Sequence, residues 1–201
     1  MDLLDMFPKD FLACARFHGH ICPGLALGYA AAKAGSGRLG VGASEDEEVV
    51  AIVENDSCAV DAIQYLLGCT FGKGNFIFRD WGKQVYTFID RKTGRAVRVS
   101  FRGPMPGHEE RRALKSKLDS GHGTDEDREA WHALRNETVR DLVCADPESL
   151  FDVTDVEMEM PPLARIVGTQ ACESCGEATV IERLVERQGR LICRGCSGES
   201  A

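Results

Sequence analysis

Four cysteines toward the C-terminal end of the chain are arranged as two Cys-x2-Cys pairs. Cys172 and Cys175 form the first pair and Cys193 and Cys196 the second, with seventeen residues between the pairs. This spacing is typical of a structural zinc site, because each Cys-x2-Cys turn presents two thiolates to one tetrahedral metal ion. Iron–sulfur ligation or a redox dithiol uses overlapping spacings and is the alternative interpretation. The pattern predicts a zinc-binding module.

A second group of metal-ligand residues lies near the start of the chain. His18, His20 and Cys22 fall within five residues of one glycine-containing segment, a loop that can turn all three side chains inward. Cys58 follows later, after Asp56 and Ser57. Zinc and iron, which are borderline-soft metals, suit such a mixed nitrogen and sulfur donor set. We expect these four residues to form a cleft that binds a second transition metal, zinc or iron.

The two thiols of this group share a position at the start of a predicted helix. Cys22 precedes a helix that begins at Pro23, and Cys58 opens the next one. Free backbone N–H groups and the helix dipole there lower the pKa of a thiol, and the thiolate is the form that binds metal. Two alternatives stay open: the residues only pack and cap the loop, or Cys22 and Cys58 cycle between dithiol and disulfide.

The elements that position these residues are read from hydrophobic periodicity and from turn residues. Helices are expected over 8–17, 23–34 and 58–67, with the glycine-rich stretch 35–42 ending the second, and a buried strand over 48–54. Three further strands over 75–79, 84–90 and 96–101 predict an antiparallel meander. Two polar helices follow, the second capped by Thr124 with Asp127. Cys14 and Cys144 fall within helical patterns and are expected to be small core residues.

A boundary is expected at Pro161-Pro162, which reads as a linker. Residues 1–162 are then an α+β core domain, with an antiparallel sheet and flanking helices, and 163–201 a small zinc ribbon or treble-clef-like zinc finger. A hairpin about Gln188-Gly189 would bring the two cysteine pairs together. A segment this short cannot bury a self-sufficient apolar core, so metal binding is expected to supply its folding free energy.

Composition and charge indicate which kind of protein this is and which partners it can bind. The 201 residues are 43% hydrophobic, a proportion that favours a packed globule over a disordered chain. No long apolar run appears and the first ten residues are acidic, so we expect a cytoplasmic protein that neither spans a membrane nor carries a secretion signal. The net charge is −8, and the segment 163–201 holds five arginines and five glutamates, which disfavours nucleic acid. The finger is therefore expected to dock a partner protein.

Several motifs together resemble one known family. They are Phe17 to Gly24 (FHGHICPG), Asp56 to Gln64 (DSCAVDAIQ), Gly68 to Asn75 (GCTFGKGN), Asp80 to Lys83 (DWGK) and the terminal cysteine pairs. In this order they resemble the family named for the E subunit of formylmethanofuran dehydrogenase, a methanogenesis-related enzyme complex. The resemblance implies an α+β core with a metal-containing cleft, often a homodimer, and an auxiliary zinc finger.

By position, the resemblance carries over His18, His20, Cys22 and Cys58 as cleft residues. Asp61, Gln64, Lys73, Asn75 and Lys83 match the pattern without a role that can be assigned from the sequence. The complex works with a molybdenum or tungsten pterin and iron–sulfur clusters held on other subunits. This chain lacks the set of ligand residues that these cofactors would need. We therefore do not expect a dehydrogenase in its own right.

The function expected from these observations is that of an accessory or metal-handling protein, with a His/Cys cleft and a structural zinc finger. One alternative is a thiol- or metal-dependent enzyme, in which His20 acts as acid, base or ligand beside the Cys22 or Cys58 thiolate. Another is a zinc-finger regulatory protein, which would need a basic face that the charge count does not provide.

Overall fold

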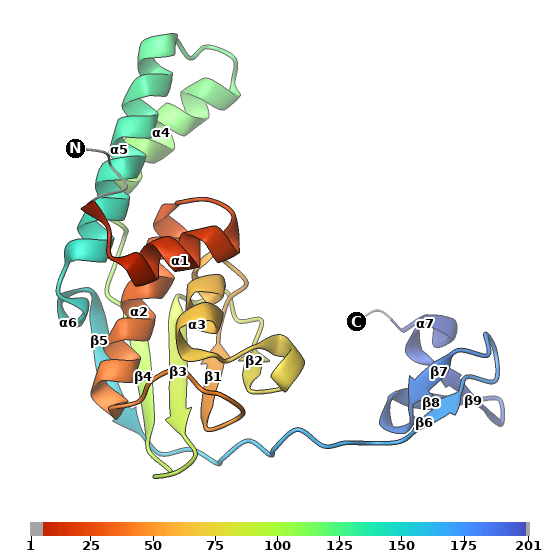
Figure 1. Cartoon of the computed structure of the whole chain (residues 1–201). Helices are drawn as coiled ribbons and strands as arrows, with labels where there is room; N and C mark the ends of the chain where they lie inside the picture. Colours follow the sequence, from red (N-terminus) through yellow and green to blue (C-terminus); the bar gives the residue numbers. More distant parts are fainter. Residues whose placement is uncertain (1–5, 200–201) are drawn as a thin grey trace. The chain divides into compact units, whose positions relative to one another are not determined.

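The computed structural model describes residues 6–199, and these fall into two compact units. The first unit, Met1–Leu163, is the core domain, and the second, Ala164–Ala201, is the cysteine module. Figure 1 shows a sheet with helices in the first unit and short strands in the second. Within residues 6–199, no helix is long and apolar enough to cross a membrane.

In residues 7–163, the core domain combines six α-helices, a 3₁₀ turn and a five-stranded sheet. The helices are α1 (Lys9–His18), α2 (Pro23–Leu39), α3 (Ala59–Leu67), α4 (His108–Asp119), α5 (Asp125–Cys144) and α6 (Pro147–Leu150), and the turn is η2 (Phe71–Lys73). The strands are β1 (Val49–Val53), β2 (Phe76–Phe78), β3 (Val85–Asp90), β4 (Ala96–Phe101) and β5 (Phe151–Val156). Together with the cysteine module, this confirms the predicted α+β class.

The strands lie in the order β2-β1-β3-β4-β5. The pairs β1–β3, β3–β4 and β4–β5 are antiparallel, whereas β2 runs parallel to β1, with Ile52 opposite Ile77. The predicted meander was therefore wrong for its first strand. A helix, α3, separates β1 from β2 in the chain, and such a crossover returns the chain to the same end of the sheet, as parallel pairing requires.

The two faces of the sheet carry different cores because side chains alternate along each strand. Ala51, Val53, Phe88 and Val97 belong to the larger core, which they share with the helices. The opposite face has a smaller cluster, consisting of Val50, Ile52, Ile89 and Ala96 with Ile77, Val156, Met158 and Met160. The helices α1, α2 and α3 thus cover one face, and the chain after β5 contributes to the other (Figure 1).

Helix α2 is longer than predicted because two of its glycines serve packing. A Cβ atom added at Gly28 would lie 2.0 Å from the carbonyl oxygen of Ala59, and one added at Gly35 would lie 2.0 Å from the Phe88 ring. Gly28 therefore lets α3 approach α2 at backbone distance, and Gly35 lets α2 lie on the sheet. The prediction that the helix stops at Gly35 was wrong, since tertiary packing outweighs the low helix propensity of glycine.

The helices α4 and α5 form a pair that projects from the sheet (Figure 1). No residue of α4 is buried, and in α5 the buried residues are Thr138, Val139, Leu142 and Val143, all near its C-terminal end. The predicted capping box is present: Thr124 and Asp127 bond to each other's backbone N–H groups. Cys144, at the end of α5, is exposed, so the prediction of a core position was wrong there, whereas Cys14 is buried.

The cysteine module consists of two small hairpins with short helical turns. Strand β6 (Thr169–Ala171) pairs with β7 (Ala178–Val180), and β8 (Leu184–Arg187) pairs with β9 (Arg190–Cys193). The turn η3 (Ile181–Arg183) joins them and α7 (Arg194–Ser197) follows β9. Gln188 and Gly189 both have positive φ, 53° and 76°, as a two-residue hairpin turn requires.

Candidate metal centre

Three of the four expected core donors come from the loop between α1 and α2. Helix α1 ends at His18, and Gly19 follows with φ 95°, a left-handed conformation that reverses the chain toward His20. Cys22 is the N-cap residue of α2, and its Sγ accepts the backbone N–H of Leu25 at 3.4 Å. The cap therefore fixes the direction of the Cys22 side chain.

The fourth donor, Cys58, is brought to this loop by the packing of α3 on α2. Cys58 is the N-cap residue of α3. A Cβ atom added at Gly24, in the first turn of α2, would lie 3.1 Å from Cβ of Cys58. The start of α3 is thus held against the start of α2, and glycines at 24 and 28 leave the room for it.

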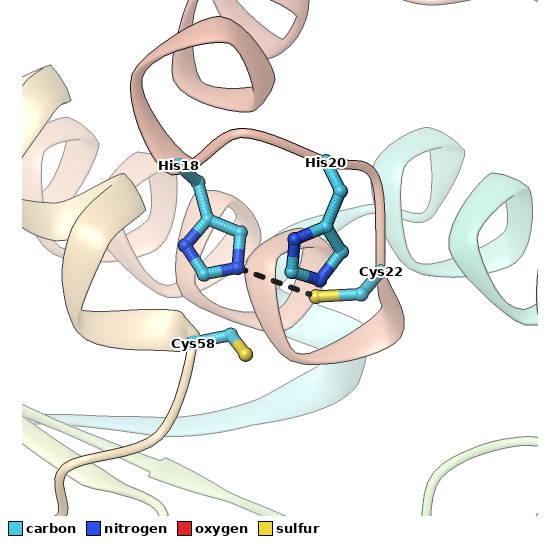
Figure 2. A group of neighbouring side chains, drawn as sticks. All are labelled: His18, His20, Cys22 and Cys58. Carbon is cyan, nitrogen blue, oxygen red and sulfur yellow. Dashed lines mark hydrogen bonds between the residues drawn. The ribbon is translucent and has the colours of Figure 1, made fainter.

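The structure brings all four predicted core residues together. One donor atom from each of His18, His20, Cys22 and Cys58 lies within 4.8 Å of the others. Nε2 of His18 lies 3.9 Å from Sγ of Cys22, and the centroids of the two imidazole rings are 4.4 Å apart. Figure 2 shows the four side chains pointing toward a common space. Two nitrogens and two sulfurs form a donor set that fits zinc or iron.

Asp61 gives His18 its orientation, a role that the sequence did not assign. Nδ1 of His18 lies 2.6 Å from Oδ2 of Asp61, and Nε2 of Gln64 donates to Oδ1 of Asp61 at 3.4 Å. A carboxylate on the far nitrogen of an imidazole selects the tautomer and leaves the other nitrogen for a metal. The spacing Cys58-x2-Asp61 was a usable signal, because it places both residues at the start of one helix.

The pKa of Cys58 differs from the sequence-based expectation. Burial, followed by the neighbouring Cys22, raises the pKa of Cys58 above its usual value. The prediction that a helix start lowers this pKa was therefore wrong for Cys58, since desolvation and a second sulfur outweigh the backbone hydrogen bond. Metal binding would have to displace this proton.

His20 lies on the solvent-exposed side of the four-donor group. Its side chain is exposed, whereas Cys22 is buried and His18 and Cys58 are partly buried. Desolvation lowers the pKa of His20, and the charges of His18 and Arg135 add to this. The neutral imidazole that results is the form that ligates metals. Arg135 reaches the loop from α5 and donates a hydrogen bond to the carbonyl of Ile21. No motif marked Arg135 in the sequence.

The remaining residues of the matched motifs act as supports. The amide of Asn75 is buried and donates to the carbonyl oxygens of Asp46, Val49 and Gly68. Lys73 donates to the carbonyls of Ser44 and Glu45. Nζ of Lys83 lies 4.0 Å from Glu54 and 5.3 Å from the centre of the Trp81 ring. These contacts stabilise loops around β1 and do not reach the four donors.

The four cysteines of the module form a second group. The Sγ atoms of Cys172, Cys175, Cys193 and Cys196 all lie within 4.8 Å of one another. The backbone N–H groups of Cys175, Cys193 and Ser174 lower the pKa of Cys172 to about 6. Cys196 N–H likewise donates to Sγ of Cys193 at 3.4 Å. Backbone donors around thiolates in two Cys-x2-Cys turns fit a tetrahedral zinc ion.

The segment that carries the core donors also matches a known family. Residues 17–152 match the family described as FmdE, molybdenum formylmethanofuran dehydrogenase operon. The chain belongs to the FmdE family. All four core donors and Asp61 lie inside the matched range, and the cysteine module lies beyond it.

Two relatives of this FmdE protein cover most of the chain. A probable S-adenosyl-L-methionine-binding protein of Archaeoglobus fulgidus is 32% identical over an alignment of 195 residues, and the match covers 93% of this chain and 52% of the relative. The chain thus spans about half the length of that curated relative. A solved structure of a tungsten formylmethanofuran dehydrogenase FmdE-like protein from Syntrophus aciditrophicus is similar with a TM-score of 0.58 and 25% identity, covering 92% of this chain and 88% of that one.

Proposed function

We propose that this FmdE protein is an accessory, metal-handling protein whose core binds one transition metal, zinc or iron, through His18, His20, Cys22 and Cys58. The observation that carries the proposal is the convergence of these four donors within 4.8 Å, with His18 oriented by Asp61. Donors from two separate segments of the chain meet here, and a carboxylate supports one of them as in protein metal sites.

The module is proposed to hold a structural zinc ion through its four cysteines and to dock a partner protein. Its equal numbers of arginine and glutamate, together with the net negative charge of a zinc ion bound by four thiolates, support a protein partner over nucleic acid. A homodimer in the cytoplasm is the state that we propose for the whole protein, from the family resemblance of the sequence.

Metal analysis of the purified chain tests both sites. The wild-type chain should hold about two metal equivalents, and Cys22→Ser or Cys58→Ser should each remove about one while the module keeps its zinc. Cys14→Ser is the matched control, since Cys14 is a buried cysteine of α1 outside both groups. An unchanged metal content in both ligand variants would contradict the core site and leave packing or a Cys22–Cys58 disulfide as its role.

A metal-dependent enzyme is the second candidate function, and the exposure of His20 favours it. If His20 leaves the metal, or stays unbound, water or substrate gains a coordination position and the site can do chemistry. The name of the Archaeoglobus relative makes S-adenosyl-L-methionine one ligand to titrate. A metal ion that keeps all four protein donors bound, with and without added ligand, would favour the accessory function.

A further inference from the structure

A cavity lies directly beside the core donors, on the side of His20. It has a volume of about 400 Å³ and is lined by Leu12, Ala15, Arg16, Gly19, His20 and Ile21. This size falls within the range of small-molecule sites. Because His20 belongs both to the cavity wall and to the four-donor group, a ligand in the cavity would lie next to the metal.

The lining combines an apolar surface with one cationic side chain, that of Arg16. Leu12, Ala15 and Ile21 supply aliphatic contact, and the ionisable side chains of the lining are Arg16 and His20, with no carboxylate among the six residues. Within residues 6–199, the Arg16 side chain has no ion pair or side-chain hydrogen bond, although most other arginines of the core domain have one. A guanidinium in this position is free to bind an anionic group from a ligand.

The wall of the cavity is held in place from two sides. The carbonyl of Ile21 accepts a hydrogen bond from Arg135 of α5, and Ala15 is buried in the core on α1. Asp61, which contacts His18, is already engaged by His18 and Gln64. The cavity therefore lacks the acidic acceptor that a cationic ligand would need, and it suits an anion.

From this arrangement we infer that the cavity is the organic-ligand subsite of the metal centre, and that it binds a small carboxylate with an apolar body. The anionic group lies at Arg16, and the apolar body lies on Leu12, Ala15 and Ile21, beside His20. The inference rests on the proposed function in one respect only: His20 belongs both to the cavity and to the proposed metal site, so the bound ligand would lie beside the metal.

Hexanoate, acetate and hexanamide are the probes, titrated into the full chain and followed by backbone amide chemical shifts in NMR spectra. Hexanoate should shift the amides of Leu12, Ala15 and Ile21. It should bind at least about tenfold more tightly than acetate, which lacks the apolar body. It should also bind about tenfold more tightly than hexanamide, which has the same length but no charge.

Two variants test the residue that is assigned to the anion. Arg16→Met keeps much of the length of the side chain and should weaken hexanoate about tenfold, while leaving hexanamide unchanged. Lys9→Met removes an exposed cation from the same helix and should change neither affinity. Equal affinities for hexanoate and hexanamide, an unaltered hexanoate affinity in Arg16→Met, or shifts located elsewhere in the chain would overturn the inference.

A failure of this inference can be separated from a failure of the metal centre. The same titrations are repeated on Cys58→Ser, whose module zinc is expected to remain while the core metal is lost. Hexanoate shifts at Leu12, Ala15 and Ile21 in that variant support the subsite independently of the metal. If the wild-type chain binds the core metal but hexanoate leaves these amides unshifted in both proteins, the subsite is wrong and the metal centre stands.

Discussion

Oδ2 of Asp61 lies 2.6 Å from Nδ1 of His18, and the two residues are 43 positions apart in the chain. The contact joins the end of α1 to the first turn of α3, so it connects the two segments that carry the core donors. With Nδ1 engaged by the carboxylate, Nε2 of His18 faces Sγ of Cys22 at 3.9 Å. The nitrogen of His18 that faces the other donors is thus selected by a residue outside the donor group.

Replacement of Asp61 tests this relationship. Asp61→Asn should weaken metal binding at the core site by about 10- to 100-fold, because the His18 ring loses the carboxylate that fixes its tautomer and raises its basicity. Affinity is measured by competition with a chelator, and zinc in the module serves as the internal reference. Asp56→Asn is the control, since Asp56 is an exposed acid just before Cys58. Equal affinities in the two variants would mean that Asp61 does not support His18.

Removal of zinc should affect the module far more than the core. A strong chelator is expected to unfold residues 164–199, because within this part only Cys172 and Ile192 are buried apolar residues and metal binding must supply most of the folding free energy. The core should persist, since its buried cluster does not depend on the module cysteines. Limited proteolysis after chelation should therefore cut the module and leave a fragment close to 1–163. A protease-resistant module without zinc would contradict this.

The approach of α3 to α2 should be sensitive to one methyl group. Gly28→Ala would place a Cβ atom 2.0 Å from the carbonyl oxygen of Ala59, so the helices must separate at a cost of about 1–3 kcal/mol in the free energy of unfolding. Because Cys58 precedes Ala59, core metal affinity should fall as well. Chemical denaturation and metal competition measure the two effects.

Gly37→Ala is the matched control in the same helix. Gly37 is exposed and a Cβ atom there would meet nothing within 4 Å. Alanine has the higher helix propensity, so this variant should gain about 0.5–1 kcal/mol and leave metal binding unchanged. Similar behaviour of the two variants would show that α2 and α3 do not pack at backbone distance.

The purified chain should show no formylmethanofuran dehydrogenase activity by itself. Among residues 6–199, the groupings of donors suited to metal are the two four-residue sets, and such chemistry needs a pterin metal centre with electron-transfer clusters. The assay uses an artificial electron acceptor with formylmethanofuran, with the metal-loaded chain as the sample. Turnover by the chain alone would contradict the accessory function.

Much of the fold, the four module cysteines and the three donors of the loop between α1 and α2 could be predicted from the sequence because they rest on local patterns. The spacing of the two Cys-x2-Cys pairs is enough to indicate a metal site. The hairpin at Gln188 and Gly189 follows from the residue types that a two-residue turn prefers. His18, His20 and Cys22 are close simply because five residues contain all three. Hydrophobic periodicity was sufficient for the α+β class, because helical and strand segments differ in the spacing of their apolar residues.

The tertiary structure decided the properties that depend on contacts between distant segments. The parallel pairing of β2 with β1, the length of α2 beyond Gly35 and the raised pKa of Cys58 each come from packing that overrides a local preference. The support of His18 by Asp61 likewise required α1 and α3 to be placed against each other. Residue type and spacing determine which side chains can bind a metal, whereas the environment of each donor depends on which atoms folding brings against it.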